Sequence, residues 1–386
     1  MKGRLALVAL LAVLGACQTP RPRPVTPHVT YVAARYADLP GWNGDALGQA
    51  WPALLSSCRV QSLPDWRTFC AAALALNAPT DASIRSFLEA NLQPFLIERT
   101  GTSAAAPETT GLLTGYFEPQ LQGSRTHLPG FDAPLYSPPD DLLTVDLGAV
   151  IPELKGKRVR GRLVGRTVVP YYTRAQLASD PALRGHEIVW LDSALDAFLL
   201  EVQGSGRIRL EDGTVIRLAY ADQNGQPYRS IGRYLVSQGE LSLGAATLPA
   251  IRAWLADHPQ RLAEVLDANP SVVFFQELPL GDPNLGPRGA QGIALTAGRS
   301  IAVDPAFIPL GTPVYLAAAD PALQRLVLAQ DTGGAISGAP RADFFCGSGD
   351  AAAGLAGSLR AQASLWLLWP RGAPLPDQNS RQILPK

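Results

Sequence analysis

Three aspartates in the last third of the chain lie at or near the ends of apolar runs. Asp304 follows SIAV, Asp331 follows LVLAQ, and Asp343 lies in RADFFCGSG, which we expect to be a loop. Strand ends that meet at one mouth of a small barrel bring distant side chains together, and close carboxylates raise one another's pKa. Such a group can exchange protons with a substrate. For any single aspartate, however, a plain turn is the commoner role.

The elements that must position these acids are mainly strands. From Leu112 onward, short apolar or alternating runs are separated by Gly, Pro and Asp, which is typical of β structure. We expect FLLEVQGSGRIRL (198–210) and SVVFFQEL (271–278) to be strands, the latter opening the last third, whose five or six strands predict a compact barrel. Apolar residues recur at helical spacing in 248–266 and between Leu47 and Leu96, so both stretches should be helical.

Several long motifs surround the aspartates. GAQGIALTAGRSIAVDPAFIPLGTPVYL and AQDTGGAISGAPRADFFCGSGDAAAGLAG closely resemble the three-aspartate domain of the membrane-bound lytic murein transglycosylase A family. The family's inserted second domain is similar to LLTGYFEPQLQGS, VVPYYTRAQL, FLLEVQGSGRIRL and YADQNGQPYRSIGRYL, which lie upstream. The resemblance covers most of 110–370.

The resemblance implies a mainly β fold with a helical N-terminal segment. It implies a double-psi β-barrel domain plus an inserted second β domain, with a glycan-binding groove between them. The corresponding boundaries in this chain are 31–111 for the helical segment that joins the barrel, 112–268 for the inserted domain, 269–370 for the barrel and 371–386 for a flexible tail.

The resemblance also implies a peptidoglycan lytic transglycosylase in which a single acid, here Asp343, cleaves the MurNAc-GlcNAc β-1,4 bond. The 6-hydroxyl of the muramic acid attacks its own anomeric carbon, which gives a 1,6-anhydro end, so one carboxyl group serves as acid and then as base. Ordinary glycosidases use two. Asp343 must then be protonated when substrate binds, and Phe344, Phe345 or a nearby Asp331 would raise its pKa.

Other residues are candidates for support and for sugar binding. Asp331 and Asp304 are expected to support the site, either through the backbone or by touching sugar. Polar groups and an accessible backbone make a loop at Gln203, Gly204, Ser205 and Gly206 a candidate for sugar contact, with a plain hairpin as the alternative. Tyr116 and Tyr220 are candidates for stacking on sugar rings, although burial is the commoner fate of a tyrosine beside a strand.

Two competing interpretations use the same residues. The string DTG at 331–333 is typical of one half of an aspartic-protease dyad, but it occurs once, so a dyad would need a homodimer. A non-catalytic wall-binding lipoprotein would keep the groove and cleave nothing. The presence of Asp343 favours the enzyme.

Composition excludes some partners and predicts others. Lys and Arg number 33, as do Asp and Glu, with no basic cluster, so we expect no nucleic acid. The four histidines fall at no metal-ligand spacing, and we expect neither a metal nor another cofactor. The short separation of Cys58 and Cys70 in an exported chain makes a disulfide between them a further expectation. We expect a monomer whose partners are peptidoglycan strands, the membrane and possible cell-wall synthesis proteins.

The N-terminus predicts export and a lipid anchor. Lys2 and Arg4 precede an apolar run too short to span a bilayer, so residues 1–16 are typical of a signal peptide. The run ends LGAC, which resembles the lipobox cut before a lipidated cysteine, here Cys17. Residues 17–30 then form a proline-rich linker. Gln18, by resemblance to bacterial lipoproteins, favours the periplasmic face of the outer membrane.

The lipid anchor can be tested directly. Cys17→Ser removes the sulfur that would be acylated, so it should block lipid attachment and change processing. Metabolic labelling with a fatty-acid analogue measures this, and equal labelling of wild type and variant would refute the anchor.

Overall fold

The computed structural model describes residues 28–100, 107–151, 154, 159–318 and 323–376. The predicted signal peptide, Cys17 and the end of the tail from 377 lie outside this range. Strand β1 already begins at His28, inside the segment predicted as linker. Arg371 at the start of the predicted tail donates to the carbonyl of Glu89, so that part of the tail packs on the body. Within the described residues no helix is long and apolar enough to cross a membrane.

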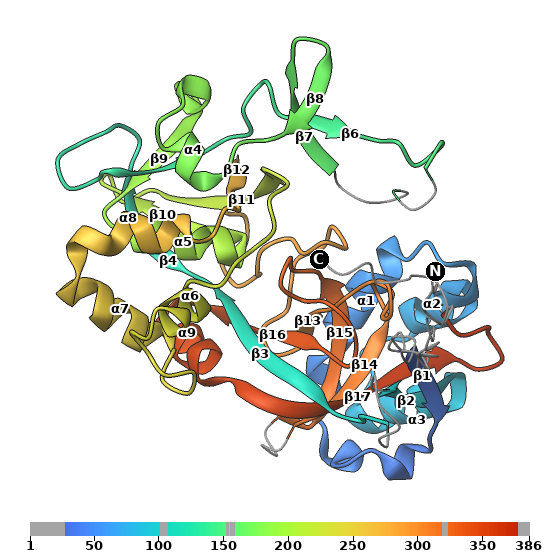
Figure 1. Ribbon diagram of the computed structural model, residues 1–386. Coiled ribbons are helices and arrows are strands. Elements are labelled where there is room, and N and C mark those ends of the chain that lie inside the picture. Colours follow the sequence, from blue (N-terminus) through green and yellow to red (C-terminus); the bar gives the residue numbers. More distant parts are fainter. Residues whose placement is uncertain (1–27, 101–106, 152–153, 155–158, 319–322, 377–386) are drawn as a thin grey trace, which may run out of the picture.

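The lower body in Figure 1 is a closed barrel. Its sheet runs in the order β1-β2-β17-β14-β15-β13-β16-β3, and β17 also pairs with β3, which closes a ring of six strands. This confirms the predicted fold class, a barrel with an inserted second β domain and a helical N-terminal segment. The strands are β1 (His28–Ala33), β2 (Leu92–Thr100), β3 (Gly111–Glu118), β13 (Ser300–Ala302), β14 (Pro313–Ala318), β15 (Arg325–Asp331), β16 (Ala342–Ser348) and β17 (Arg360–Pro370).

The upper body is the inserted domain, which holds a second sheet in the order β12-β11-β10-β4-β9-β5. Its strands are β4 (Gln120–Ser124), β5 (Ala133–Tyr136), β9 (Glu187–Leu191), β10 (Ser205–Leu210), β11 (Val215–Gln223) and β12 (Val273–Leu278). A small sheet contains β6 (Leu143–Val145), β7 (Val159–Val164) and β8 (Thr167–Pro170). The helices are α4 (Arg174–Leu177), α5 (Ala194–Gln203), α6 (Ile231–Ser237), α7 (Leu248–Asp257) and α8 (Leu262–Asp267).

Two boundaries differ from the prediction. The run SVVFFQEL, assigned to the barrel, supplies β12, which pairs with β11 in the second sheet. The inserted domain therefore extends past 268. At its other end, Leu112 lies in β3, which pairs with β16 and β17 of the barrel. Apolar strands are needed in both cores, so composition alone does not assign a strand to a domain.

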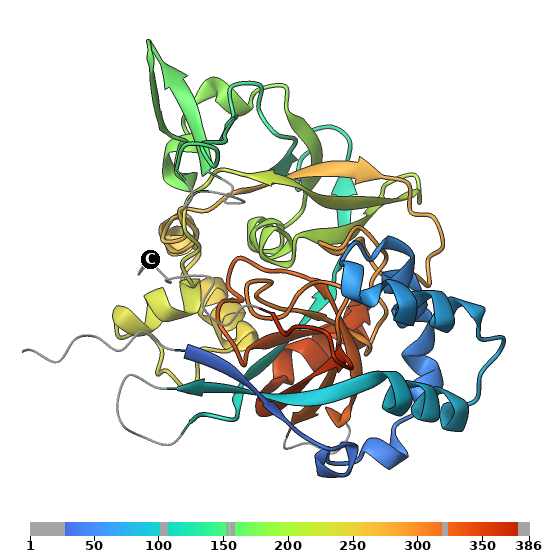
Figure 2. The ribbon, with the colours of Figure 1, turned by 90° about the vertical axis from the view of Figure 1, so that its right-hand side faces the viewer.

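The N-terminal helices are α1 (Trp51–Val60), α2 (Arg67–Ala75) and α3 (Asp81–Asn91), and they cover one side of the barrel (Figure 2). Trp51, Leu54 and Phe69 bury their rings and methyl groups in the same core as the barrel strands. Cys58 and Cys70 form a disulfide that joins α1 to α2. One more helix, α9 (Gly349–Ser358), follows β16 and packs against β3.

A buried ionic cluster joins the two bodies where β3 leaves the barrel. Glu118, the last residue of β3, is fully buried and accepts hydrogen bonds from Arg207 Nε at 2.8 Å and Arg217 Nε at 2.7 Å. The Ser348 hydroxyl donates to the same carboxylate at 2.8 Å. Both guanidinium groups also donate to the carbonyl of Leu285. Two arginines of the second sheet thus share one carboxylate of the barrel as their counter-ion.

Glu118→Gln should strongly destabilise the protein, because two buried guanidinium groups would lose their counter-ion. Breaking a buried ion pair from one side typically costs about 3–5 kcal/mol. The matched control is Glu277→Gln, which removes the carboxylate from an exposed pair with Arg125 and should cost about 1 kcal/mol or less. Urea denaturation measures both. Equal small losses would show that the cluster does not hold the bodies together.

Candidate active site

Strand register places two of the three aspartates on either side of one residue. Ala302 of β13 pairs with Asp331 of β15 and with Asp343 of β16. Asp343 therefore lies in a strand and not in the predicted loop. Two strand spacings separate the backbones of the two acids by about 10 Å.

The Asp343 carboxylate is held by a short chain of hydrogen bonds. The Thr114 hydroxyl, on β3, donates to Asp343 Oδ1 at 2.6 Å. Arg341 Nη2 donates to the Thr114 oxygen at 2.8 Å. A guanidinium group only donates, so the hydroxyl must use its own proton toward Asp343. Arg341 thus fixes the direction of the Thr114 hydroxyl.

Burial is the largest influence on the pKa of both acids. It raises the pKa of Asp343 above its ordinary value, against the Thr114 hydrogen bond and the Arg341 charge, which lower it. Burial also raises the pKa of Asp331, and the charge of Asp343 adds to this rise. Phe344, one of the expected causes, points to the opposite side of the strand from Asp343, because neighbouring residues of a strand alternate.

Asp331 and Asp304 accept hydrogen bonds from backbone N–H groups, and Asp331 also accepts one from a tyrosine hydroxyl. Asp331 Oδ1 accepts from the N–H groups of Ala290 and Thr332, and Oδ2 accepts from the Tyr116 hydroxyl at 2.9 Å. Asp304 accepts from two backbone N–H groups, those of residues 306 and 338. Tyr116 is only 8% exposed. Its geometry therefore fits support of Asp331 and not the predicted stacking on sugar.

The predicted sugar-binding loop is a turn from helix to strand. The run FLLEV belongs to α5 and not to a strand, and Gly204 ends this helix with a φ of 78°. Gln203 Oε1 accepts from the N–H of Phe117 on β3 at 3.1 Å. Ser205 is buried, and a Cβ at Gly206 would lie 2.5 Å from Leu200. These residues dock α5 and β10 against β3.

Tyr220, the other candidate for sugar stacking, lies on β11 of the second sheet. It is half-buried, and its backbone pairs with Phe275 of β12. Of the two tyrosines, Tyr116 is the one whose hydroxyl donates to an acid of the site, Asp331.

Three residues missed in the sequence share the outer face of the barrel with Asp343. Thr114 pairs with Asp343 on one side and with Arg360 of β17 on the other. Directly paired residues project from the same face of a sheet, and Arg341, two residues before Asp343, shares that face. The signal available in the sequence is the alternation R-A-D in 341–343, which places both charges on one face.

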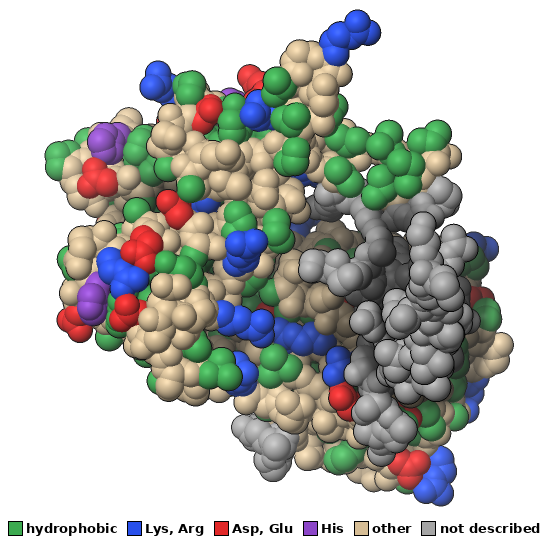
Figure 3. Space-filling model, in the orientation of Figure 1, with side chains coloured by type: hydrophobic (Ala, Val, Ile, Leu, Met, Phe, Trp, Pro, Cys, Tyr) green, Lys and Arg blue, Asp and Glu red, His purple; other side chains and the backbone are tan. Residues whose placement is uncertain are grey.

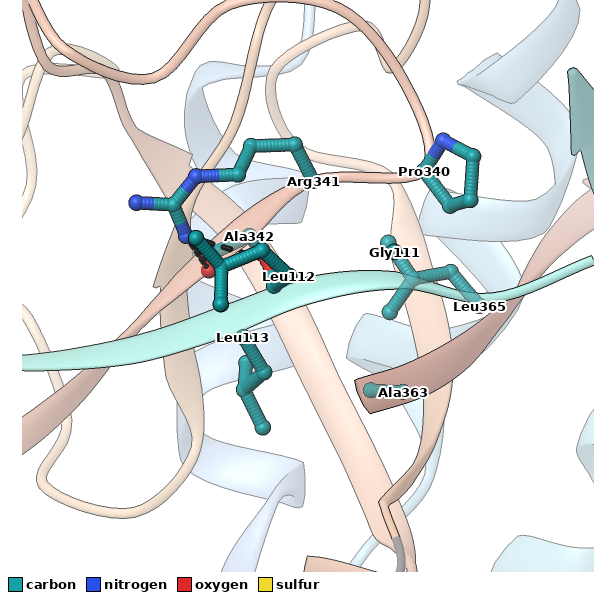
Figure 4. A pocket seen from close by; sticks show the side chains of 8 residues that line it. All are labelled: Gly111, Leu112, Leu113, Pro340, Arg341, Ala342, Ala363 and Leu365. Carbon is teal, nitrogen blue, oxygen red and sulfur yellow. Dashed lines mark hydrogen bonds between the residues drawn. The ribbon is translucent and has the colours of Figure 1, made fainter. Parts of the chain in front are cut away.

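A pocket adjoins this face beside Arg341. It has a volume of about 400 Å³ and is lined by Arg99, Glu108, Thr110, Gly111, Leu112, Ser337, Ala339, Pro340, Arg341 and Gln362. Figure 4 shows a second, tightly packed pocket that shares Arg341, Pro340, Gly111 and Leu112 with it, and there Arg341 donates to the carbonyl of Leu112. A Cβ at Gly111 would lie 1.5 Å from the Pro340 carbonyl oxygen, so only glycine fits there. Figure 3 shows the hollow between the two bodies, with basic side chains gathered along it.

Comparison with known proteins agrees with this architecture. Residues 112–276 match the family model of the MltA specific insert domain, and residues 299–369 match that of the 3D domain. Fold and site thus define a class of proteins in which a barrel with a 3D domain carries an MltA-type insert. The chain is 30% identical over 291 residues to membrane-bound lytic murein transglycosylase A of Escherichia coli K12, covering 72% of this chain and 71% of the relative. The chain belongs to the membrane-bound lytic murein transglycosylase A family, whose members are enzymes.

Solved structures show the same relationship. The crystal structure of a membrane-bound lytic murein transglycosylase from Agrobacterium tumefaciens has a TM-score of 0.77 and 30% identity, covering 89% of this chain and 98% of that chain. The structure of E. coli MltA with bound chitohexaose has a TM-score of 0.63 and 25% identity, covering 86% and 91%.

Asp343→Asn should raise the stability of the protein at pH 7. The folded-state pKa of Asp343 lies above its unfolded value, so the ionised carboxylate is less favourable in the folded protein, and stability is lost as pH rises from the unfolded pKa through the folded one. Asparagine stays neutral and still accepts from Thr114. Asp304→Asn is the control, because the amide keeps one acceptor for two N–H donors and should cost about 1–2 kcal/mol.

Thermal denaturation at pH 4 and pH 7 measures this prediction. The gain from Asp343→Asn should be larger at pH 7 than at pH 4. A melting temperature lowered at pH 7 would contradict the proposed burial cost.

Proposed function

We propose that this protein cleaves the MurNAc-GlcNAc β-1,4 bond of peptidoglycan glycan strands and leaves 1,6-anhydro-MurNAc ends. The observation that carries the proposal is Asp343, a half-buried carboxyl group with a raised pKa on the outer face of the barrel. Support comes from membership of the lytic murein transglycosylase A family and from the relative that binds chitohexaose. The hollow seen between the two bodies in Figure 3 suits an extended glycan.

The first step is protonation of the leaving group. Protonated Asp343 donates its proton to the glycosidic oxygen while the bond from this oxygen to the anomeric carbon breaks. Thr114 donates to Oδ1, which leaves Oδ2 as the oxygen that carries the acidic proton. The nearby charge of Arg341 stabilises the carboxylate that remains. Arg341 and Thr114 are therefore positioning residues for the acid.

The second step uses the same carboxylate as a base. It takes the proton of the muramic 6-hydroxyl while that oxygen bonds to the anomeric carbon, which closes the 1,6-anhydro ring and restores protonated Asp343. No water is consumed. One carboxyl group therefore serves both steps, in contrast to the pair that hydrolysing glycosidases use.

Two other functions are less well supported. In an aspartic protease the DTG aspartate shares a proton with a second carboxylate. In this protein the two carboxylate oxygens of Asp331 together already accept three hydrogen bonds, and none of the three donors is a carboxyl group. A wall-binding protein without activity would not need an acid with a raised pKa. The product analysis below separates both from the lyase.

For localisation, we propose that the lipid on Cys17 holds the enzyme at the periplasmic face of the outer membrane. The family name describes membrane-bound proteins. From Cys17, eleven residues lead to His28, where β1 begins, and they span at most about 40 Å when extended. An anchored enzyme would therefore work close to the membrane surface.

Asp343→Ala should abolish most activity, because general acid/base catalysis is worth about 10²–10⁴-fold. Purified sacculi are digested and the released fragments are analysed by mass. Wild-type fragments should lack one water relative to hydrolysed ends. Asp304→Asn serves as the control for loss of a supporting carboxylate. Reducing ends would show that water is the nucleophile, and an active Asp343→Ala would place the acid elsewhere.

A further inference from the structure

Two arginines flank the proposed acid, and neither forms a salt bridge within the described part of the chain. Arg360 pairs with Thr114 from β17, and Arg341 donates to the Thr114 hydroxyl from β16. Among the described residues Arg341 donates only to Thr114 and to the carbonyls of Leu112 and Ala342. Burial lowers the pKa of Arg341, the charge of Asp343 raises it, and the charge of Arg360 lowers it further, because the two cations repel each other.

Arg341 lines the pocket of about 400 Å³, and Arg360 lies on the same face of the sheet through its pairing with Thr114. Gln362 pairs with Leu112 and, two residues from Arg360, shares its face of β17. Gln362 lines the pocket together with Arg341 and Ser337, and so does the exposed ion pair of Arg99 and Glu108. The pocket therefore offers cationic and neutral hydrogen-bond donors, and the carboxylate in this lining, Glu108, is already paired with Arg99. Its volume is in the range of small-ligand sites.

Half-buried cations that lack a counter-ion are costly, because desolvation is not offset by an opposite charge. Arg341 is held in this state next to Asp343, and the protonated form of Asp343 gives it no negative charge. An anion brought by the substrate would supply the missing counter-charge. Arginine binds carboxylates with two parallel hydrogen bonds, which favours this group as the ligand.

We propose that Arg341 and Arg360 form a carboxylate-binding subsite beside Asp343, which selects muramyl residues that carry a carboxylate over neutral sugars. The proposal rests on the proposed glycan-cleaving function and specifies its substrate. Muramic acid bears a lactyl group that GlcNAc lacks. Its carboxyl group is free in peptide-free strands, whereas in peptide-bearing strands the stem peptide supplies the carboxylates. Both sources share the chemistry that the subsite recognises.

The test uses Arg360→Gln, because Arg341 also positions the acid. Binding is measured by calorimetry in the Asp343→Asn background, which leaves the ligands uncleaved. The probes are peptide-free muramyl oligosaccharides, peptide-bearing strands of equal length and chitohexaose. Arg209→Gln is the matched control, since Arg209 is also an exposed strand arginine but lies on β10 of the second sheet.

Arg360→Gln should weaken binding of a carboxylate-bearing ligand by about three- to tenfold, the scale of one charge-assisted contact at an exposed position. Chitohexaose binding should not change, and Arg209→Gln should leave all three unchanged. A loss confined to peptide-bearing strands assigns the stem carboxylate, and a loss on peptide-free strands assigns the lactyl carboxylate. An equal loss on chitohexaose, or no loss on either muramyl ligand, overturns the subsite.

Failure of the subsite and failure of the proposed function give different results. The subsite is read from ratios of binding constants, which need no cleavage. The function is read from the mass of fragments that the wild type releases. Raising salt should also reduce the wild-type preference for charged ligands, because counter-ions screen an exposed charge pair.

Discussion

The Glu118 carboxylate is the constraint on which the arrangement of the two bodies depends. It is fully buried, and from the last position of a barrel strand it is the shared counter-ion of Arg207 and Arg217 of the second sheet. Strand β3 also carries Thr114 and Tyr116 on the face of the two acids. One strand therefore fixes the inserted domain, the proposed acid and its support. A shift of the inserted domain relative to the barrel would have to break this cluster or move β3.

Burial and charge are balanced differently at the two ends of β3. At Glu118 two arginines share one buried carboxylate as counter-ion, so the cluster serves structure. At Asp343 the carboxyl group is desolvated, its pKa is raised, and the neighbouring cations Arg341 and Arg360 form no salt bridge among the residues that the structure describes. Groups whose charges are left unsatisfied by the fold mark functional sites. The contrast supports the assignment of the proposed reaction to the Asp343 end.

Much of the fold could be predicted from the sequence. The family resemblance and the apolar pattern predicted the barrel, the insert and the N-terminal helices. The errors fall where local patterns are ambiguous. FLLEV is mostly apolar because α5 packs between the second sheet and other helices, and a short apolar run cannot be told from a strand by its pattern alone. Asp343 was predicted, but Thr114 and Arg360 were not, because their proximity depends on the register of β3 with β16 and β17.

The contact between Thr114 and Asp343 joins residues separated by 229 positions in the chain. During synthesis β3 therefore emerges long before its partner strand β16 exists, and the ring of six strands has no closing members until β16 and β17 are made. Contacts so distant in sequence form late in folding, because the intervening loop must first be closed. A nascent or prematurely ended chain thus lacks an assembled acid, and the capacity to cut a polymer arises only with the finished polypeptide.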